Sequence, residues 1–195
     1  MEIEKQDRRV RRTNRLLKQA LAELMREKDF QEISVRDVAE RADINRGTFY
    51  MHFSSTYDLL AHLENETLKD FQSMIDQYAG STQARDLRSL LEPITDYIAA
   101  NADICKCLFQ NRAASDFLDK FQQLIYENGT MRIRARFPNV AQDTLHSFFA
   151  FATFGMIGIL KEWLDADLPE GREIIVSHAA QLVSGAAEGV LSPVS

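Results

Sequence analysis

The sequence contains little cysteine, proline or glycine. Among its 195 residues are two cysteines, four prolines and eight glycines, whereas hydrophobic residues make up 45%. Two cysteines as close as Cys105 and Cys107 cannot form the disulfide framework of a small secreted protein, which favours a reducing compartment. The low proline and glycine content argues against a disordered, low-complexity chain. We therefore expect a globular, cytoplasmic protein with a packed core.

A long hydrophobic segment is also missing. The longest apolar run, Phe148–Leu160, contains Thr153 and two glycines, and it is shorter than the roughly 20 residues that a membrane-spanning helix needs. The segment after the basic N-terminus, Thr13–Met25, is amphipathic rather than continuously apolar, unlike a signal peptide. These features predict a buried helix and argue against secretion or a membrane partner.

Motifs for catalysis and metal binding are absent as well. The sequence has no Gly-x-Ser-x-Gly elbow, no His-Glu-x-x-His and no phosphate-binding glycine loop. Asp143 and His146 form a single carboxylate-x-x-histidine pair, whereas a di-iron bundle needs two. On a helix, Cys105 and Cys107 would point to nearly opposite sides. We expect no catalytic residue, no metal and no cofactor.

Positive charge is scarce overall but concentrated at the N-terminus. The net charge of −6 taken alone argues against a nucleic-acid-binding protein. Residues 1–28, however, contain nine Lys and Arg against five Asp and Glu, and the remainder contains fourteen against twenty-four. A basic head on an acidic body is typical of a protein that touches phosphate with one end. The alternative is a basic helix that is merely solvated.

The first two helices follow from periodicity and capping. Apolar residues at three- and four-residue spacing predict a helix over about Arg9–Lys28 with one apolar face and one cationic face. After a break at residues 29–33, Ser34 and Asp37 have the spacing of a capping box. A second, short helix therefore starts there and ends near Arg41.

A third helix completes a helix-turn-helix. Residues 42–44 form a tight turn, and Asn45 can cap a helix with Phe49 and Phe53 on its inner side. Because so small a unit is not stable alone, the first helix must cover it. The side chains expected to be buried between them are Leu17, Leu21, Leu24, Val38, Ile44, Phe49 and Phe53.

Helical periodicity continues to the end of the chain, without strand-type alternation or internal repeats. The fold class is therefore all-α with about nine helices. We divide the chain into a three-helix head at residues 1–56 and a helical bundle at residues 57–195. The expected bundle helices are Tyr57–Tyr78, Asp86–Asn101, Ala102–Gln110, Ser115–Arg134, Ala141–Leu164 and Gly171–Leu191.

The head resembles the TetR/AcrR family of transcriptional regulators. The resemblance lies in the segments ISVRDVA at 33–39, ADINRGTFYMHF at 42–53 and YDLL at 57–60. Two positions depart from the family pattern. Asp43 replaces a turn glycine, which is tolerable because Asp accepts left-handed backbone angles. Thr56 stands where a lysine usually reaches a phosphate.

The resemblance implies that the third helix lies in the major groove of operator DNA. Arg46 at its start could bind the O6 and N7 atoms of a guanine. The arginine arm Arg8, Arg9, Arg11 and Arg12 would follow the phosphate backbone, unless it is only a disordered tail. The expected DNA-binding residues are Arg36, Asn45, Arg46, Gly47, Thr48, Tyr50, His52 and Thr56; the alternative for each is ordinary helix surface.

The resemblance also implies a homodimer whose last two helices form the interface, and middle helices that enclose a small-molecule effector. Such a dimer would bind a near-palindromic operator, and repression relieved by the effector is the family default. The candidate pocket residues are the aromatic side chains of the middle helices, which could instead be plain core: Tyr97, Phe109, Phe117, Phe121, Phe148, Phe151 and Trp163. The competing hypothesis is a helix-turn-helix protein whose C-terminal region binds a protein partner rather than a small ligand.

Overall fold

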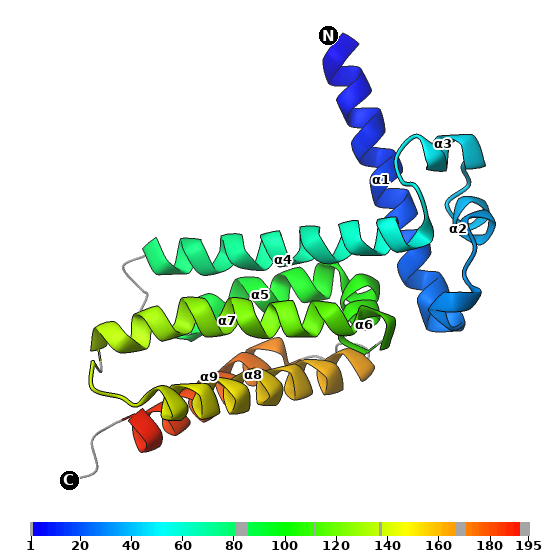
Figure 1. Cartoon of the computed structure of the whole chain (residues 1–195). Coiled ribbons are helices and arrows are strands. Elements are labelled where there is room, and N and C mark those ends of the chain that lie inside the picture. The colour runs from blue at the N-terminus through cyan, green and yellow to red at the C-terminus, as the bar shows by residue number, and fades with distance from the viewer. Residues whose placement is uncertain (1, 81–85, 111, 137, 167–170, 192–195) are drawn as a thin grey trace. The chain divides into compact units, whose positions relative to one another are not determined.

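The computed structural model describes residues 2–80, 86–110, 112–136, 138–166 and 171–191. Within these ranges the chain forms α-helices, two 3-10 helices at Phe30–Glu32 and Arg112–Ala114, and no strand, which confirms the predicted all-α class (Figure 1). The α-helices are α1 (Glu2–Glu27), α2 (Val35–Arg41), α3 (Arg46–Tyr50), α4 (Thr56–Gly80), α5 (Arg88–Ala100), α6 (Ala102–Gln110), α7 (Ser115–Arg136), α8 (Gln142–Asp165) and α9 (Arg172–Leu191).

Helix α1 differs most from its predicted bounds. It begins at Glu2 rather than near Arg9. The periodicity of apolar residues could not reveal this extension, because the extension contains few of them. The arginine arm is consequently helical.

The described contacts divide the chain into two compact units. The first comprises Met1–Thr67 and Asn101–Ser115, and the second comprises Leu68–Ala100 and Asp116–Ser195. This division differs from the boundary expected after Thr56, because α6 and the first part of α4 belong with the head. The reason lies in α1, which packs against α6 as well as against α2.

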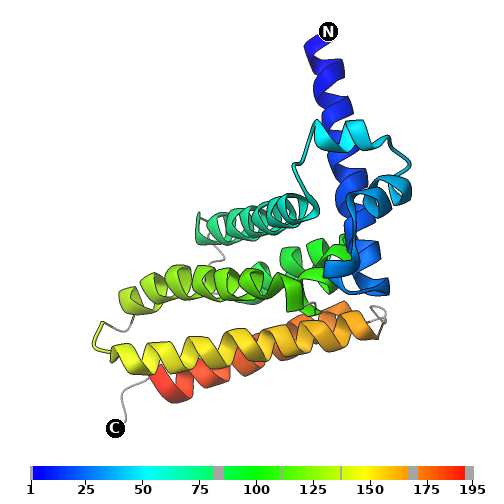
Figure 2. The same ribbon diagram turned by 45° about the vertical axis from the view of Figure 1, so that its right-hand side comes forward.

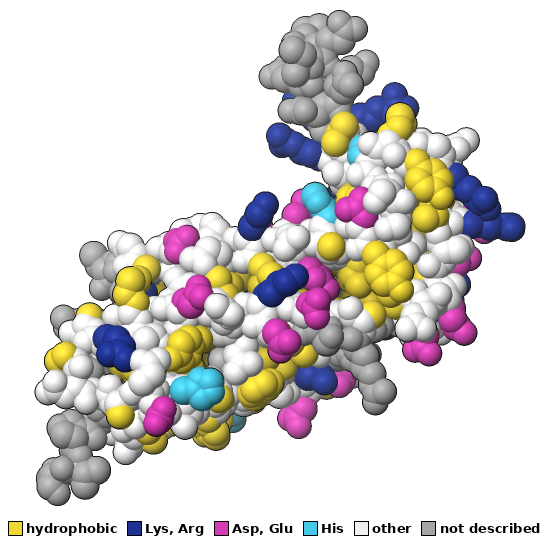
Figure 3. Space-filling view, viewed as in Figure 1, with side chains coloured by type: hydrophobic (Ala, Val, Ile, Leu, Met, Phe, Trp, Pro, Cys, Tyr) yellow, Lys and Arg dark blue, Asp and Glu magenta, His cyan; other side chains and the backbone are white. Residues whose placement is uncertain are grey.

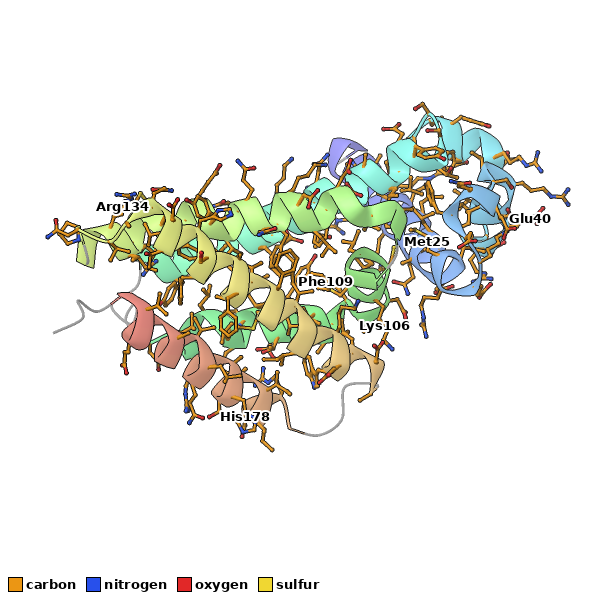
Figure 4. The ribbon with its side chains drawn as sticks, turned by 60° about the horizontal axis from the view of Figure 1, so that its bottom comes forward. Met25, Glu40, Lys106, Phe109, Arg134 and His178 are labelled. Atoms are coloured by element: carbon orange, nitrogen blue, oxygen red, sulfur yellow. The ribbon has the colours of Figure 1, made fainter. Side chains whose placement is uncertain are left out.

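In the first unit, α1 provides the surface on which the short helices rest (Figure 2). Leu17 and Leu21 of α1 are fully buried. Asp103 of α6 fastens α6 to α1, since its carboxylate accepts a hydrogen bond of 3.0 Å from Gln19 Nε2 and forms an ion pair with Arg26. Met25, labelled in Figure 4, also belongs to this buried layer.

The second unit is built around α8, which packs against α9, while α9 also packs against α5. Helices α7 and α8 run antiparallel in both ribbon views. By length and composition α8 could cross a membrane, but one of its faces is buried through Leu145, Phe149, Ile157 and Leu160. The apolar residues of α8 therefore serve two faces. One face is buried in the core, and the other is exposed through Phe151 and Phe154.

The capping box at the start of α2 is confirmed. The Asp37 backbone N–H donates to Ser34 Oγ at 3.2 Å, and the Ser34 backbone N–H donates to Asp37 Oδ2 at 2.8 Å. Lys28 Nζ donates to the same carboxylate at 3.0 Å. The backbone hydrogen bond from Ser34, with smaller contributions from Lys28 and the Ser34 hydroxyl, lowers the pKa of Asp37 to about 2.

Replacing this carboxylate should weaken the fold in a pH-dependent way. We expect Asp37→Asn to lower the free energy of unfolding by about 1 kcal/mol near neutral pH, as for the loss of other caps. Because the pKa falls from an ordinary 3.8 to about 2 on folding, the contribution is complete above about pH 4 and disappears as the pH falls toward 2. Urea unfolding at several pH values measures the difference between variant and wild type.

Asp29→Asn is the matched control, because the Asp29 side chain makes no capping hydrogen bond. It should leave the stability unchanged across the same pH range. A difference between Asp37→Asn and wild type that stays constant from neutral pH down to pH 2 would contradict the role given to the carboxylate.

Candidate functional site

The turn between α2 and α3 is set by one residue with a left-handed backbone. Asp43 has a φ of 54°, which confirms that Asp adopts the left-handed backbone expected at this turn position. The Ile44 N–H donates to the Ala39 carbonyl at 3.0 Å, closing the end of α2. Asn45 then caps α3, its Oδ1 accepting from the Gly47 N–H at 2.8 Å. These contacts fix where α3 starts.

Buried aromatic side chains on the inner face of α3 and just after it hold this helix in place. Phe49 is fully buried, and Phe53 packs beside it with ring centroids 6.0 Å apart. This anchoring leaves the opposite face outward, so that Arg46 and Gly47 are exposed and Tyr50 is 60% exposed. The structure therefore brings these three predicted DNA-binding residues together on one surface.

Met51 extends this surface and was not predicted. It follows the last residue of α3 and is 76% exposed, more than the other large hydrophobic side chains among the described residues. Its place four residues after Gly47 was the available signal, because that spacing puts it on the outward face.

The remaining predicted DNA-binding residues are placed differently. Thr48 and His52 are half-buried. Arg36 is exposed on α2, where its Nε donates to Glu40 Oε1 at 2.6 Å. Thr56 is only 7% exposed at the start of α4, so its side chain offers almost no surface to a phosphate. Burial in the core thus removes Thr56 from the set of candidate contacts.

The arginine arm forms a cationic surface on the first half of α1. Arg8, Arg11, Arg12 and Arg15 are exposed and recur at three- and four-residue spacing, which places them on one face of the helix. Arg9 is exposed on a neighbouring face. In Figure 3 Lys and Arg side chains border the region that α1, α2 and α3 form. The first unit thus combines a cationic helix with the exposed side of α3.

A cavity of about 290 Å³ lies within the second unit. Residues of α4, α5, α7, α8 and α9 line it, and most of them are apolar. The polar exceptions among the described lining residues are Tyr78, Asn128, Arg132, Thr153 and Ser184. A mostly apolar cavity with a few polar groups is the usual form of a small-molecule site.

One wall of the cavity depends on a glycine. A Cβ atom on Gly129 would lie 2.2 Å from Cε1 of Phe149, so only glycine allows this ring to pack against α7. Near it, the Arg132 guanidinium lies over the Tyr78 ring, 4.3 Å from its centroid. Burial raises the pKa of the Tyr78 hydroxyl, although the charge of Arg132 opposes this shift.

Two of the seven predicted pocket aromatics, Phe121 and Phe148, line the cavity. The prediction was wrong for the other five, because aromatic side chains on middle helices can also fill the core elsewhere or, as for Phe151, face outward. Phe117 stacks on Phe121 from behind, with centroids 6.0 Å apart. Phe109 is buried on α6 in the first unit (Figure 4). The remaining three are Tyr97, which packs on Phe71, Trp163, which is buried away from the lining, and Phe151, which is 63% exposed.

The polar lining residues of α7 were missed, although the sequence carried a signal for them. Asn128 and Arg132 lie seven and eleven residues after Phe121, and Ile125 lies between. This is the spacing of one helix face. A charged residue that interrupts an apolar helix face is a better indicator of a ligand site than another aromatic residue on the same face.

The cysteines and acidic residues form no reactive or metal-binding group within the described ranges. Cys105 and Cys107 are buried, and burial raises the pKa of each thiol to about 12. Cys107 Sγ contacts Met25 Sδ at 3.2 Å. A buried, protonated thiol is a poor nucleophile, so both cysteines are packing residues. No cluster of His, Cys, Asp or Glu suited to a metal ion occurs in the described residues.

The first unit thus carries a helix-turn-helix and the second an apolar cavity, which are the two parts expected of a transcriptional regulator. Two family models match the chain: "Bacterial regulatory proteins, tetR family" over residues 17–63 and "Transcriptional regulator C-terminal region" over residues 85–185. The chain belongs to the TetR family of transcriptional regulators. The first match covers the helix-turn-helix of the first unit, and the second covers α5, α7, α8 and most of α9, which line the cavity.

A curated relative and two solved structures agree with this assignment. The chain is 41% identical over 172 residues to YxbF, an HTH-type transcriptional regulator of Bacillus subtilis, covering 86% of this chain but 44% of that protein. It resembles the fatty acid degradation regulator FadR from Bacillus halodurans, with a TM-score of 0.71, 16% identity and coverage of 89% and 95% of the two chains. It also resembles FadR from Bacillus subtilis in complex with stearoyl-CoA, with a TM-score of 0.68 and 15% identity. That alignment covers 88% of this chain and 97% of the other.

Proposed function

We propose that the chain is a cytoplasmic, homodimeric repressor that binds a near-palindromic operator and releases it when an effector enters the cavity of the second unit. The observation that carries this proposal is the exposed surface of Arg46, Gly47 and Tyr50, which the buried Phe49 holds outward. Catalysis plays no part in it. Because the chain spans 44% of the length of YxbF, the proposal concerns this chain alone.

On DNA, the residues at the start of α3 read the bases. Arg46 binds guanine through O6 and N7, and Gly47 lets the backbone approach the groove closely. Asn45, Thr48 and Tyr50 contact phosphates or base edges, and His52 contacts the backbone. Arg36 on α2 reaches the same groove after leaving Glu40. The arginine arm of α1 adds affinity that does not depend on sequence.

A second copy of the chain covers the exposed apolar face of α8 and α9. Phe151 and Phe154 share a face of α8 with Gly155 and Gly158, at spacings of three, four and seven residues. Ile174 and Leu182 are exposed on α9, and a Cβ on any of Gly155, Gly158, Gly185 or Gly189 would meet no atom within 4 Å. Exposed apolar side chains beside glycines are suited to close, symmetric helix packing.

A small molecule that is largely apolar is the proposed effector. The lining of the cavity supports this, and the structural neighbour from Bacillus subtilis carries stearoyl-CoA. The effector acts by favouring one separation of the two heads, because major grooves on one face of DNA recur every 34–36 Å or so. The competing hypothesis of a protein partner has no comparable observation in its support.

The reading role of Arg46 predicts a specific loss of selectivity. After operator selection from random duplexes, Arg46→Ala should reduce the ratio of operator to random-DNA affinity by roughly 5- to 150-fold, corresponding to about 1–3 kcal/mol for a guanine contact. Fluorescence anisotropy on both duplexes measures it. Lys69→Ala, which removes one exposed positive charge from the second unit, should leave the ratio unchanged. An unaltered ratio for Arg46→Ala would refute this role.

The arginine arm predicts a loss of salt dependence instead. Replacing Arg8, Arg11 and Arg12 with Gln should weaken binding to all duplexes alike. The slope of log affinity against log salt concentration should fall by roughly 2–3, because each phosphate contact contributes about 0.9. Titrations over a range of KCl concentrations provide the slope. An unchanged slope would mean that this face of α1 does not touch DNA.

The dimer interface predicts a monomeric variant. Leu182→Asp puts a charge into the proposed interface, and Leu182 is exposed in the single chain. The variant should therefore keep its helix content, become monomeric by light scattering and lose protection of the two half-sites. Met131→Asp on α7 changes an even more exposed apolar residue and should remain dimeric. A dimeric Leu182→Asp protein would show that the interface lies elsewhere.

A further inference from the structure

The polar groups that line the cavity of the second unit define a ligand more narrowly than its apolar walls do. Arg132 is the one charged side chain among the described lining residues. Its guanidinium is a cation with a planar set of donors that matches a carboxylate. The guanidinium carbon lies over the Tyr78 ring, 4.3 Å from its centroid. This end of the cavity is therefore built for one carboxylate.

The neighbouring Asn128 supports this end without competing for the ligand. Its Nδ2 donates to the Leu124 carbonyl at 2.9 Å and to Gln72 Oε1 at 3.3 Å. These contacts to its own helix and to α4 satisfy the amide. Arg132 is thus the residue of this pair that a ligand would meet by charge.

A second polar group lies deeper in the cavity. Thr153 of α8 lines it and is 3% exposed, and its Oγ1 has no hydrogen-bond partner among the described residues. Thr95 of α5, equally buried, shows the usual solution, because its hydroxyl donates to the Leu91 and Glu92 carbonyls of its own helix at 2.9 Å each. A buried hydroxyl without a partner is uncommon and unfavourable. A ligand oxygen would satisfy it.

The two polar groups lie apart along the cavity. Phe149 packs against Gly129, so these two residues lie at the same height along α8 and α7. The two helices run antiparallel. Arg132 is three residues from Gly129 toward the loop between these helices, and Thr153 is four residues from Phe149 in the opposite direction. At a rise of about 1.5 Å per residue, roughly 10 Å separates them along the helix axes.

Beyond Thr153 the lining is apolar again, through Met156 and Leu160 of α8 and Phe121 of α7. Along α7 and α8 the order is therefore the cation of Arg132, the apolar side chains of Phe149 and Ala152, the Thr153 hydroxyl and a second apolar stretch. We propose that the cavity binds an oxygenated fatty acid, with its carboxylate on Arg132 and a hydroxyl or keto oxygen in mid-chain on Thr153.

This assignment rests on the proposed function, because it names the class of effector that enters the regulatory cavity. It differs from the acyl-CoA held by the neighbour from Bacillus subtilis. A coenzyme A group carries several negative charges, whereas the described lining offers one cation. An unmodified fatty acid would satisfy Arg132 but leave Thr153 without a partner.

Calorimetry with a series of tetradecanoic acids tests the assignment. The probes are tetradecanoic acid, its derivatives with a single hydroxyl at successive mid-chain carbons, the methyl ester of each, and tetradecanoyl-CoA. One hydroxylated isomer should bind about tenfold more tightly than tetradecanoic acid, the gain from one buried hydrogen bond. Tighter binding of tetradecanoyl-CoA, or equal binding of all free acids, would overturn the proposal.

Variants at the two polar groups give separate readouts. Thr153→Val keeps the shape and removes the hydroxyl, so it should abolish the preference for the hydroxylated acid while leaving tetradecanoic acid bound. Thr130→Val is the matched control, because Thr130 also has a buried hydroxyl without a partner but does not line the cavity. Arg132→Gln should weaken the acids roughly 10- to 100-fold and leave the methyl esters unchanged.

Operator binding, measured on the same preparations, separates this proposal from the proposed function. If the wild type binds its operator but Thr153→Val retains the preference for the hydroxylated acid, the ligand assignment alone is wrong. If the acids bind as expected but no duplex is bound, the regulator assignment alone is wrong. If both proposals are right, the hydroxylated acid should release the protein from its operator. Tetradecanoic acid at the same concentration should leave the protein bound to the operator.

Discussion

The burial of Phe49 is the interaction on which the outward surface of α3 depends. A helix of five residues has no stability of its own, because helix nucleation costs more than one turn returns. Helix α3 exists because Phe49 is fully buried beside Phe53, and because the Asn45 side chain caps its first turn. The same contact decides which way the helix faces. The burial of Phe49 therefore determines both the stability of α3 and the set of α3 residues that are exposed.

This constraint also explains why the head was predictable. Capping residues, a turn residue and a pair of phenylalanines are local signals that lie within twenty residues of one another, and each leaves a pattern in the sequence. The helix bounds of the bundle followed for a similar reason, since apolar spacing and loop residues mark them. Both kinds of signal concern neighbours along the chain.

The cavity was less predictable because its walls come from five helices. Aromatic residues were natural candidates, but Phe117 and Trp163 fill the core, and nothing local distinguishes them from Phe121 and Phe148. Burial of Thr56 was hidden for the same reason. The polar residues Asn128 and Arg132 were the better indicators, because a charge on an apolar face needs an explanation, whereas one more phenylalanine does not.

The membership of α6 in the first unit has a practical consequence for dissecting the molecule. Helix α1 is held on one side by α2 and on another by α6, where Asp103 bonds Gln19 and Arg26 and where Cys107 contacts Met25. A fragment cut after the helix-turn-helix would leave that second side of α1 bare, with apolar and charged groups both deprived of their partners. The minimal autonomous head is therefore discontinuous in sequence, and a shorter version would have to supply α6 through a designed linker.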